Sequence, residues 1–183
     1  MKRIALIVSL MFLLIGQAQA ESGDQYYLVN LGYTQKDISE KPDPLILASL
    51  SYGYGLTQKW AVEVDYAQSI SGGGLTKEIT PTESVDGDYS VWFMTLGAAY
   101  RHIFLDTFYF KGKAGFTFGE DELKFNDNTA VDNDKKSIEA FSGGLGVGYL
   151  AGDVIGSSVT VEAGLVMHSQ DLMSLMIGAN ATF

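Results

Sequence analysis

The last twelve residues, LMSLMIGANATF (172–183), alternate between two kinds of side chain. Apolar residues occupy every second position and end in an aromatic carboxy-terminus: Met173, Leu175, Ile177, Ala179, Ala181 and Phe183. Successive side chains of a β-strand point to opposite faces, so this pattern predicts a strand with one fully apolar face. Such a face is typical of a transmembrane strand, which presents it to lipid and places the aromatic residue at the interface.

The first twenty residues have the three parts of a secretory signal peptide. Lys2 and Arg3 precede an uncharged apolar stretch over 4–15, and Ala18-Gln19-Ala20 has the form of a cleavage site. The apolar stretch is too short for a spanning helix, which needs about 20 residues. The sequence therefore predicts a signal peptide over 1–20 and a single mature domain over 21–183.

Charge and cysteine content narrow the function classes. Without Lys2 and Arg3, the mature chain would hold 10 basic and 22 acidic residues, a net charge of −12. Such a chain is not expected to bind nucleic acid through bulk charge. Cysteine is absent, so disulfides do not stabilise this exported protein, and closure of a β-barrel with complete backbone pairing is another source of stability.

Eight alternating segments follow the signal peptide. They lie near 25–33, 45–56, 60–69, 89–100, 107–119, 138–149, 158–168 and 172–183. Most have the roughly 9–11 residues that a tilted transmembrane strand needs. Long polar connections over 34–44, 69–88 and 120–137 alternate with short ones, as in outer-membrane barrels. We therefore predict an all-β protein, an eight-stranded antiparallel transmembrane up-and-down β-barrel with three long outer loops.

The two faces of these segments differ in size and charge. Bulky apolar and aromatic residues share one face, and small or charged residues share the other. Because side chains just fill an eight-stranded barrel, we expect the aromatic residues to face lipid and the small residues to face inward. The charged residues expected inside are Glu63, Asp65, Lys111, Lys113 and Glu162. We expect them to pair, since buried charges need partners, rather than to form a polar pathway or an acid/base site.

Four stretches resemble the small outer-membrane β-barrel superfamily of OmpA-type and OmpX/Ail-type proteins. They are YLVNLGYT (27–34), SYGYGLTQKWAVEVDY (51–66), VWFMTLGAAYRH (91–102) and IGANATF (177–183). The resemblance covers 25–183, and it implies the outer membrane of a bacterium as the location. It also implies adhesion or stress-resistance roles, which some members have. The chain departs from the pattern at Ala181, where such proteins often carry a tyrosine.

His168, Ser169 and Asp171 form the one grouping that suggests hydrolysis. Some eight-stranded outer-membrane barrels, the lipid A deacylases, use His and Ser in a His-x-Ser motif at the outer surface. Here the two residues are adjacent, and adjacent strand residues point to opposite faces, so the histidine is poorly placed to activate the serine. His102 is expected in a periplasmic turn. We interpret both histidines as rim residues and predict no catalytic site.

The third long loop, 120–137, is rich in Asp and Asn. Oxygen ligands from Asp127, Asn128, Asp132 and Asp134 suit Ca²⁺, but their spacing does not match an EF-hand. Gly72-Gly73-Gly74 lacks the context of a phosphate-binding loop, and the composition of 69–88 is that of a flexible linker. We predict no metal and no cofactor.

These observations favour a non-enzymatic surface protein with a structural or adhesion role. Its expected partners are outer-membrane lipids, lipopolysaccharide and an extracellular partner that binds the loops 34–44, 69–88 and 120–137. A monomer is expected. The alternatives are a lipid-modifying enzyme with its site near His168 and a narrow channel for small solutes, because fold alone does not determine function.

Overall fold

The structure is a computed structural model that describes residues 23–36, 43–80, 83–125, 133–154 and 157–183. The signal peptide predicted over 1–20 lies outside these residues. Nine strands are described: β1 (Gln25–Lys36), β2 (Leu45–Gly55), β3 (Trp60–Ser69), β4 (Gly73–Thr80), β5 (Glu83–Phe104), β6 (Phe108–Phe125), β7 (Asp134–Val154), β8 (Ser157–Ser169) and β9 (Leu172–Thr182). Among the described residues, no helix is long and apolar enough to cross a membrane.

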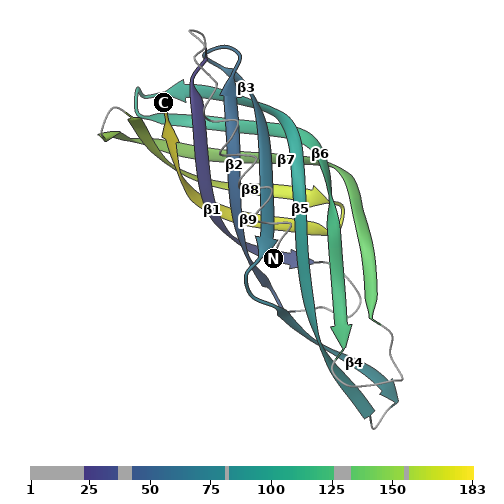
Figure 1. Ribbon diagram of the computed structural model, residues 1–183. Helices are drawn as coiled ribbons and strands as arrows, with labels where there is room; N and C mark the ends of the chain where they lie inside the picture. Colours follow the sequence, from purple (N-terminus) through teal and green to yellow (C-terminus); the bar gives the residue numbers. More distant parts are fainter. Residues whose placement is uncertain (1–22, 37–42, 81–82, 126–132, 155–156) are drawn as a thin grey trace.

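Eight of these strands close into an antiparallel barrel (Figure 1). The strand order is β3-β2-β1-β9-β8-β7-β6-β5-β4, and a further pairing of β3 with β5 completes the ring. The first and last barrel strands pair, with Tyr26 opposite Thr182, so both ends of the barrel chain lie together. The predicted eight-stranded up-and-down barrel is confirmed.

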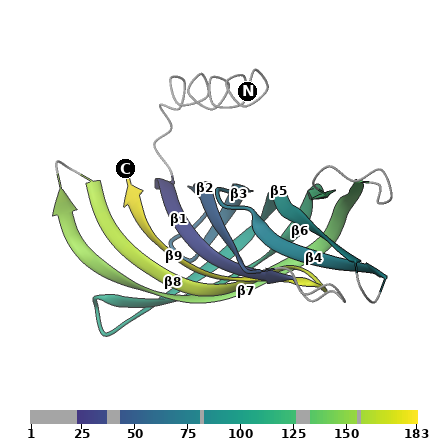
Figure 2. The same cartoon turned by 90° about the horizontal axis from the view of Figure 1, so that it is seen from below.

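The ninth strand corrects the prediction of three loops. β4 lies outside the ring and pairs only with the outer part of β5, so the segment 69–88 forms a hairpin rather than a flexible linker (Figure 2). β6 and β7 also continue to Phe125 and from Asp134, inside the segment 120–137. The sequence analysis treated these residues as connections because polar, charged and glycine residues predominate in them. One face of the outer strands is nevertheless buried, with Val85 and Tyr89 at most 6% exposed.

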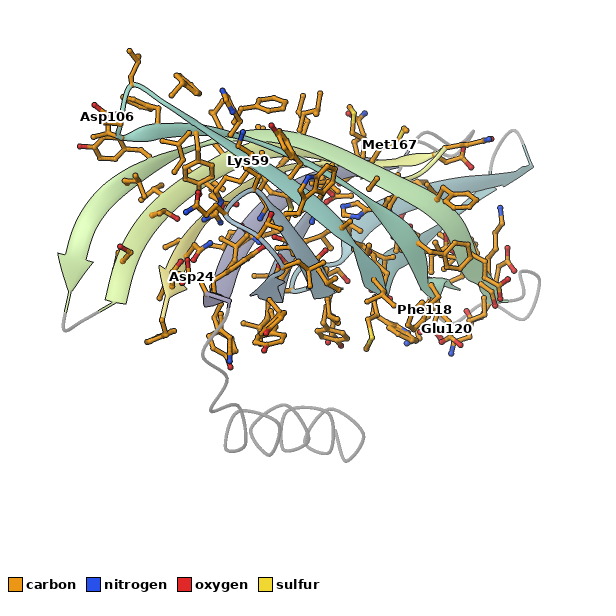
Figure 3. All side chains as sticks on the ribbon, turned by 90° about the horizontal axis from the view of Figure 1, so that it is seen from above. Asp24, Lys59, Asp106, Phe118, Glu120 and Met167 are labelled. Carbon is orange, nitrogen blue, oxygen red and sulfur yellow. The ribbon has the colours of Figure 1, made fainter. Side chains whose placement is uncertain are left out.

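The outer surface of the barrel is apolar, as predicted. Leu96, Leu165 and Ile177 are more than half exposed, and Figure 3 shows Phe118 and Met167 on the outside. Aromatic rings gather beside the short turns, where the ring centroids of Trp60 and Tyr100 lie 5.0 Å apart. The turns 56–59 and 105–107 and both ends of the barrel chain share one side of the barrel, which is the periplasmic side in outer-membrane barrels.

Large inward side chains lie directly on glycines of the neighbouring strand. Gly53 is opposite Tyr26, and a Cβ atom there would lie 2.1 Å from the tyrosine ring. Gly148 is opposite Tyr109 with the same separation. The same arrangement recurs in the pairs Gly32/Met176 and Gly178/Asn30. These glycines leave the room that bulky groups need inside a narrow barrel.

Candidate functional site

Six charged side chains meet in the periplasmic half of the lumen. They come from four strands: Glu63 and Asp65 from β3, Arg101 from β5, Lys111 and Lys113 from β6, and Glu162 from β8. Lys111 Nζ lies 2.5 Å from Glu63 Oε1 and 3.2 Å from Glu162 Oε2. Lys113 Nζ lies 2.9 Å from Asp65 Oδ2. The predicted pairing is confirmed, and three carboxylates balance three cations.

Arg101 and two tyrosines complete this periplasmic network, and sequence reasoning did not assign them to it. Arg101 Nη2 lies 3.7 Å from Glu162 Oε1, and the guanidinium lies over the rings of Tyr26 and Tyr109, 5.1 and 4.6 Å from their centroids. The Tyr109 hydroxyl donates to Glu162 Oε1 at 2.5 Å, and the Tyr26 hydroxyl donates to Glu63. Tyr109 lies two residues from Lys111 and therefore on the same face of the strand. This period-2 alternation was the sequence signal that could have assigned Tyr109 to the network.

His168 lies inside the barrel, which corrects its interpretation as a rim residue. Its side chain is buried, with Nε2 2.9 Å from Ser174 Oγ and the ring centroid 4.1 Å from that of Phe93. Ser174 Oγ in turn lies 2.6 Å from Thr34 Oγ1. The rim prediction was wrong because β8 continues through His168 and still faces the lumen there.

Ser169 follows a register shift between Met167 and Ser169, and His168 bonds Ser174 instead of this serine. Asp171 is exposed in the turn before β9. His102 is exposed and belongs to β5, whereas a turn was predicted. The structure therefore does not bring together the three residues that suggested hydrolysis.

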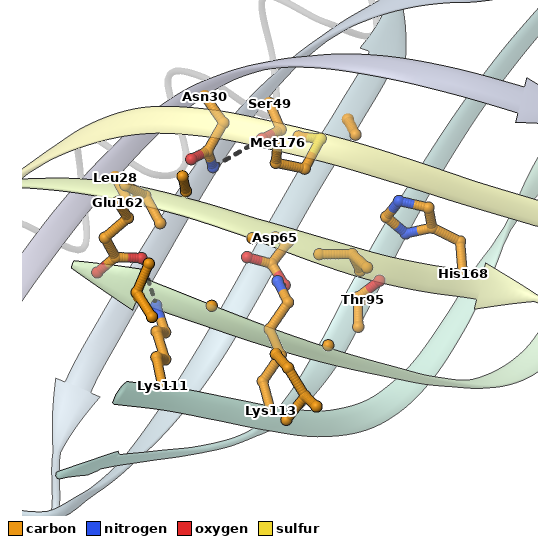
Figure 4. Close-up of a pocket in the computed structure, with 18 of the residues that line it drawn as sticks. Leu28, Asn30, Ser49, Asp65, Thr95, Lys111, Lys113, Glu162, His168 and Met176 are labelled. Carbon is orange, nitrogen blue, oxygen red and sulfur yellow. Dashed lines mark hydrogen bonds and ion pairs between the residues drawn. The ribbon is translucent and has the colours of Figure 1, made fainter. Parts of the chain in front are cut away.

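A cavity of about 60 Å³ lies in the middle of the lumen, between the network and His168 (Figure 4). Asp65 Oδ1 and His168 Nδ1 are buried and have no hydrogen-bond partner among the described residues. Both residues line the cavity, which is large enough for a few water molecules. Hydration of these two atoms is the simplest chemistry that the cavity supports.

Apolar side chains fill most of the extracellular half of the lumen, beside the buried polar side chains of Thr34, Ser174 and Asp121, which corrects the expectation of a uniformly small and charged interior. Its buried cluster consists of Leu45, Leu47, Ala67, Tyr89, Val91, Phe93, Ile138 and Leu172, with Leu123 and Phe125 packed against it. Leu47 and Phe93 are at most 1% exposed. Because these side chains are buried, apolar groups fill the space at lower free-energy cost than charges would.

The described residues include one of the four whose oxygens suit Ca²⁺. Asp127, Asn128 and Asp132 lie outside them, and Asp134 is exposed at the start of β7. In the part of the chain that the structure describes, no group of three or more His, Cys, Asp or Glu side chains has the geometry of a metal site.

Four strands project beyond the barrel on the extracellular side (Figures 1 and 2). β4 pairs with β5 from Gly73 to Thr80, and β5 pairs with β6 as far out as Gly87 and Phe125. The pairing of β6 with β7 reaches Leu123 and Asp134. We call this part the outer sheet: β4 with residues 83–91 of β5, 119–125 of β6 and 134–138 of β7. Ordered backbone pairing thus replaces much of the loop surface predicted from sequence.

The extracellular end of the chain is strongly acidic. Residues 34–44, 69–88, 120–137 and 169–171 hold fourteen acidic and six basic side chains, a net charge of −8. The six charged residues of the lumen network sum to zero, so these connecting segments account for most of the formal net charge of −10 of the chain.

Comparison with known proteins places these features in a family. The model of the outer membrane protein beta-barrel domain matches residues 5–181. The chain belongs to this family. The protein is thus an outer-membrane β-barrel located in the bacterial outer membrane. Among curated proteins, the sequence has no match.

Solved structures of the same architecture cover nearly the whole described chain. Ail, the attachment invasion locus protein of Yersinia pestis in complex with the heparin analogue sucrose octasulfate, is 17% identical, with a TM-score of 0.60 over 88% of this chain and 99% of Ail. Neisserial surface protein A is 13% identical, with a TM-score of 0.62 over 88% and 100%. OprG from Pseudomonas aeruginosa is 15% identical, with a TM-score of 0.61 over 88% and 96%. At these identities the likeness establishes the fold alone.

Proposed function

We propose that this protein is a non-enzymatic surface protein whose outer sheet binds an extracellular partner while the barrel anchors it. The observation that carries this proposal is the backbone pairing of β4, β5, β6 and β7 beyond the barrel. A paired sheet loses less conformational entropy on binding than a flexible loop of the same length. Binding residues are also common on segments held by a rigid scaffold.

The filled lumen supports anchoring rather than transport. Charged residues occupy its periplasmic half and an apolar cluster occupies its extracellular half. An eight-stranded barrel has room for little beyond its own side chains. The narrow-channel alternative is therefore the weaker one.

The enzyme alternative lacks support from the geometry. A nucleophile and its base must lie within hydrogen-bond reach. His168 Nε2 contacts Ser174 rather than Ser169, and this contact lies within the lumen, away from the outer surface where lipid would bind. A change in the mass of lipid A from cells that overproduce the protein would support the lipid-modifying enzyme instead.

The partner is expected to differ from that of Ail. Ail was crystallised with a heparin analogue, a polyanion. In the sequence, the extracellular connecting segments have a net charge of −8, which would repel a polyanion. We expect a monomer surrounded by outer-membrane lipids and lipopolysaccharide, exported after removal of residues 1–20. N-terminal sequencing of the mature protein should begin at Glu21.

The test compares two variants in cells that display the protein. In the first, residues 73–87 are replaced by a two-residue Asn-Gly turn, which removes β4 and the outer end of β5. The second, His168→Ala/Ser169→Ala, is the control. We expect the first variant to remain a heat-modifiable barrel and to lose the adhesion or other surface phenotype of the intact protein. The control should keep that phenotype, and the reverse result would reject the proposal.

A further inference from the structure

The periplasmic end of the lumen contains a cavity of about 50 Å³ that the charge network does not fill. Its walls extend from the buried side chains of Ala99 and Lys111 to the exposed turn residues 57–59. The cavity therefore opens to the periplasm, at the end of the barrel opposite the outer sheet. Its volume is enough for a few water molecules. A carboxylate group, which has three heavy atoms, fits the same space.

Arg101 lines this cavity with a hydrogen-bond donor that the network does not use. Its Nη2 atom lies 3.7 Å from Glu162 Oε1, which is beyond hydrogen-bond distance, and in the described chain this buried atom has no hydrogen-bond partner. The Glu162 carboxylate already accepts from three other donors: the Tyr109 hydroxyl at 2.5 Å, Lys111 Nζ at 3.2 Å and Asn180 Nδ2 at 3.4 Å. A buried donor without an acceptor costs free energy, so a ligand that supplies an acceptor is favoured here.

Two tyrosine rings hold the guanidinium of Arg101 in place. The guanidinium carbon lies 5.1 Å from the ring centroid of Tyr26 and 4.6 Å from that of Tyr109. Such cation–π contacts attract the positive charge, but they provide no oxygen acceptor for the N–H donors. The planar fork of an arginine matches the two oxygens of a carboxylate, so the fixed guanidinium is suited to that group.

Lys59 supplies a second cation at the exposed rim of the cavity. The turn that carries it is fixed by hydrogen bonds, because the Lys59 amide donates to Thr57 Oγ1 at 3.2 Å. The amide of Arg101 donates to the backbone oxygen of Lys59 at 2.7 Å, which joins this turn directly to β5. Within the described ranges of the chain, the Lys59 side chain forms no ion pair.

The charge of the cavity favours an anion. Three basic side chains line it, those of Lys59, Arg101 and Lys111, and Asp24 is the one acidic side chain among its described lining residues. Lys111 already bridges two carboxylates of the network, so Arg101 and Lys59 are the cations available to a ligand. Two cations at the opposite ends of one small cavity attract a single negative group between them.

We propose that the periplasmic mouth of the barrel binds a carboxylate group. Arg101 donates hydrogen bonds to it at the inner end of the cavity, and Lys59 attracts it at the rim. The ligand is either a small free carboxylate or the terminal carboxylate of a peptide, since both present the same group. This site is independent of the surface-binding function proposed above, because it lies at the other end of the barrel.

The test uses the folded protein, labelled with ¹⁵N, in lipid nanodiscs. Nuclear magnetic resonance follows the side-chain Nε–Hε signal of Arg101 and the backbone amides of 57–60. The three probes are acetate, the peptide acetyl-Gly-Gly with a free terminal carboxylate, and acetyl-Gly-Gly amide, which lacks that group. All titrations are made at constant ionic strength, because salt screens exposed charges.

Three variants accompany the wild type. Arg101→Lys keeps the charge and removes the planar fork, Lys59→Gln removes the cation at the rim, and Lys136→Gln removes an exposed lysine at the extracellular end as the matched control. Lys59 lies in an exposed turn, so its variant tests the site even if Arg101→Lys does not fold. Heat modifiability shows which variants are folded.

We expect saturable shifts with acetate or acetyl-Gly-Gly and none with the amide. Binding of acetate alone would support a free carboxylate as the ligand, and binding of acetyl-Gly-Gly would support a terminal one. Arg101→Lys should weaken binding about tenfold, the effect of losing a charge-assisted hydrogen bond. Lys59→Gln should weaken it about threefold, the effect of one exposed ion pair, and Lys136→Gln should change nothing.

Four results would overturn the proposal. Neither acetate nor acetyl-Gly-Gly producing a saturable shift would show that the mouth has no carboxylate site. Equal binding of the amide would show that the carboxylate is not recognised. Unchanged binding by a folded Arg101→Lys variant would remove the arginine fork from the site. Equal weakening by Lys136→Gln and Lys59→Gln would show attraction by bulk charge rather than by this cavity.

Discussion

The two halves of the lumen are filled by different chemistry. In the periplasmic half, Lys111 bridges Glu63 and Glu162, and tyrosine hydroxyls donate to both carboxylates. In the extracellular half, Leu47 and Phe93 belong to a buried cluster made almost entirely of apolar side chains. The cavity beside His168 lies where the two halves meet.

This difference shows that either a charge network or an apolar cluster can fill the lumen of a narrow barrel. Side chains fill both halves, but the two halves should lose stability in different ways. Removing one member of a charge network leaves another charge buried without a partner, whereas removing an apolar side chain leaves a cavity. The stability of variants in each half therefore separates the two mechanisms.

The largest effect is expected for Lys111→Met, which leaves Glu63 and Glu162 without their shared cation. We expect a loss of about 3–5 kcal/mol in the free energy of unfolding, measured by urea unfolding in lipid vesicles. The double variant Lys111→Met/Glu63→Gln should lose less than the sum of the two single changes. Strict additivity of the two changes would show that the network does not couple them.

In the extracellular half, Leu47→Ala should cost about 2–5 kcal/mol, because it opens a cavity in the apolar cluster. Combined with Glu63→Gln, its effect should add within about 0.5 kcal/mol, since the two residues share no partner. The same urea measurement serves here. Strong coupling would mean that the two halves form one cooperative interior.

A third environment, the lipid-facing surface, provides the next comparison. Val64, Leu96 and Phe116 are register partners on adjacent strands and face outward, and Leu165 faces outward on β8. Arginine at any one of these positions should cost about 2–4 kcal/mol if it lies near the bilayer midplane. If all four arginine variants are as stable as the wild type in vesicles, these faces do not meet lipid.

The smallest effect is expected for the pair of Asp65 and Lys113, whose side chains are 9% and 23% exposed. A double-mutant cycle with Asp65→Asn and Lys113→Met should give a coupling of about 1 kcal/mol, less than that of Glu63 with Lys111. A cycle of Glu63→Gln with Lys113→Met should give none, because no contact joins them. The reverse ranking would contradict the observed pairing.

The period-2 alternation predicted the barrel and the face of each charged residue, because odd- and even-numbered residues of a strand point to opposite faces. It placed Glu63, Asp65 and Lys111 inside correctly. It did not predict which inward residues meet, because contacts such as Tyr26 over Gly53 depend on strand register, which the turns and barrel closure determine.

The apolar extracellular half left a signal that was not used. Leu45, Leu47 and Leu172 are inward positions that begin strands directly after outer connections, and all three are apolar. The inward residues nearest the extracellular connections are apolar, and those farther along the strands are charged. Grouping inward residues by this distance would have distinguished the two halves of the lumen. The outer hairpin of β4 left a weaker signal, because glycine, threonine and charged residues predominate over 72–88 and isolated apolar residues such as Val85 do not form the long alternation of a transmembrane strand.

Conductance in planar lipid bilayers tests most directly whether each half closes the lumen by itself. The measurement compares the wild type, an apolar-half variant (Leu47→Ala/Phe93→Ala), a network variant (Glu63→Gln/Lys111→Met) and a protein that combines all four changes. We predict no single-channel steps from the first three, and steps from the combined variant alone. Single-channel conductance steps from the wild type, or from a variant altered in only one half, would contradict the claim that each half closes the lumen independently.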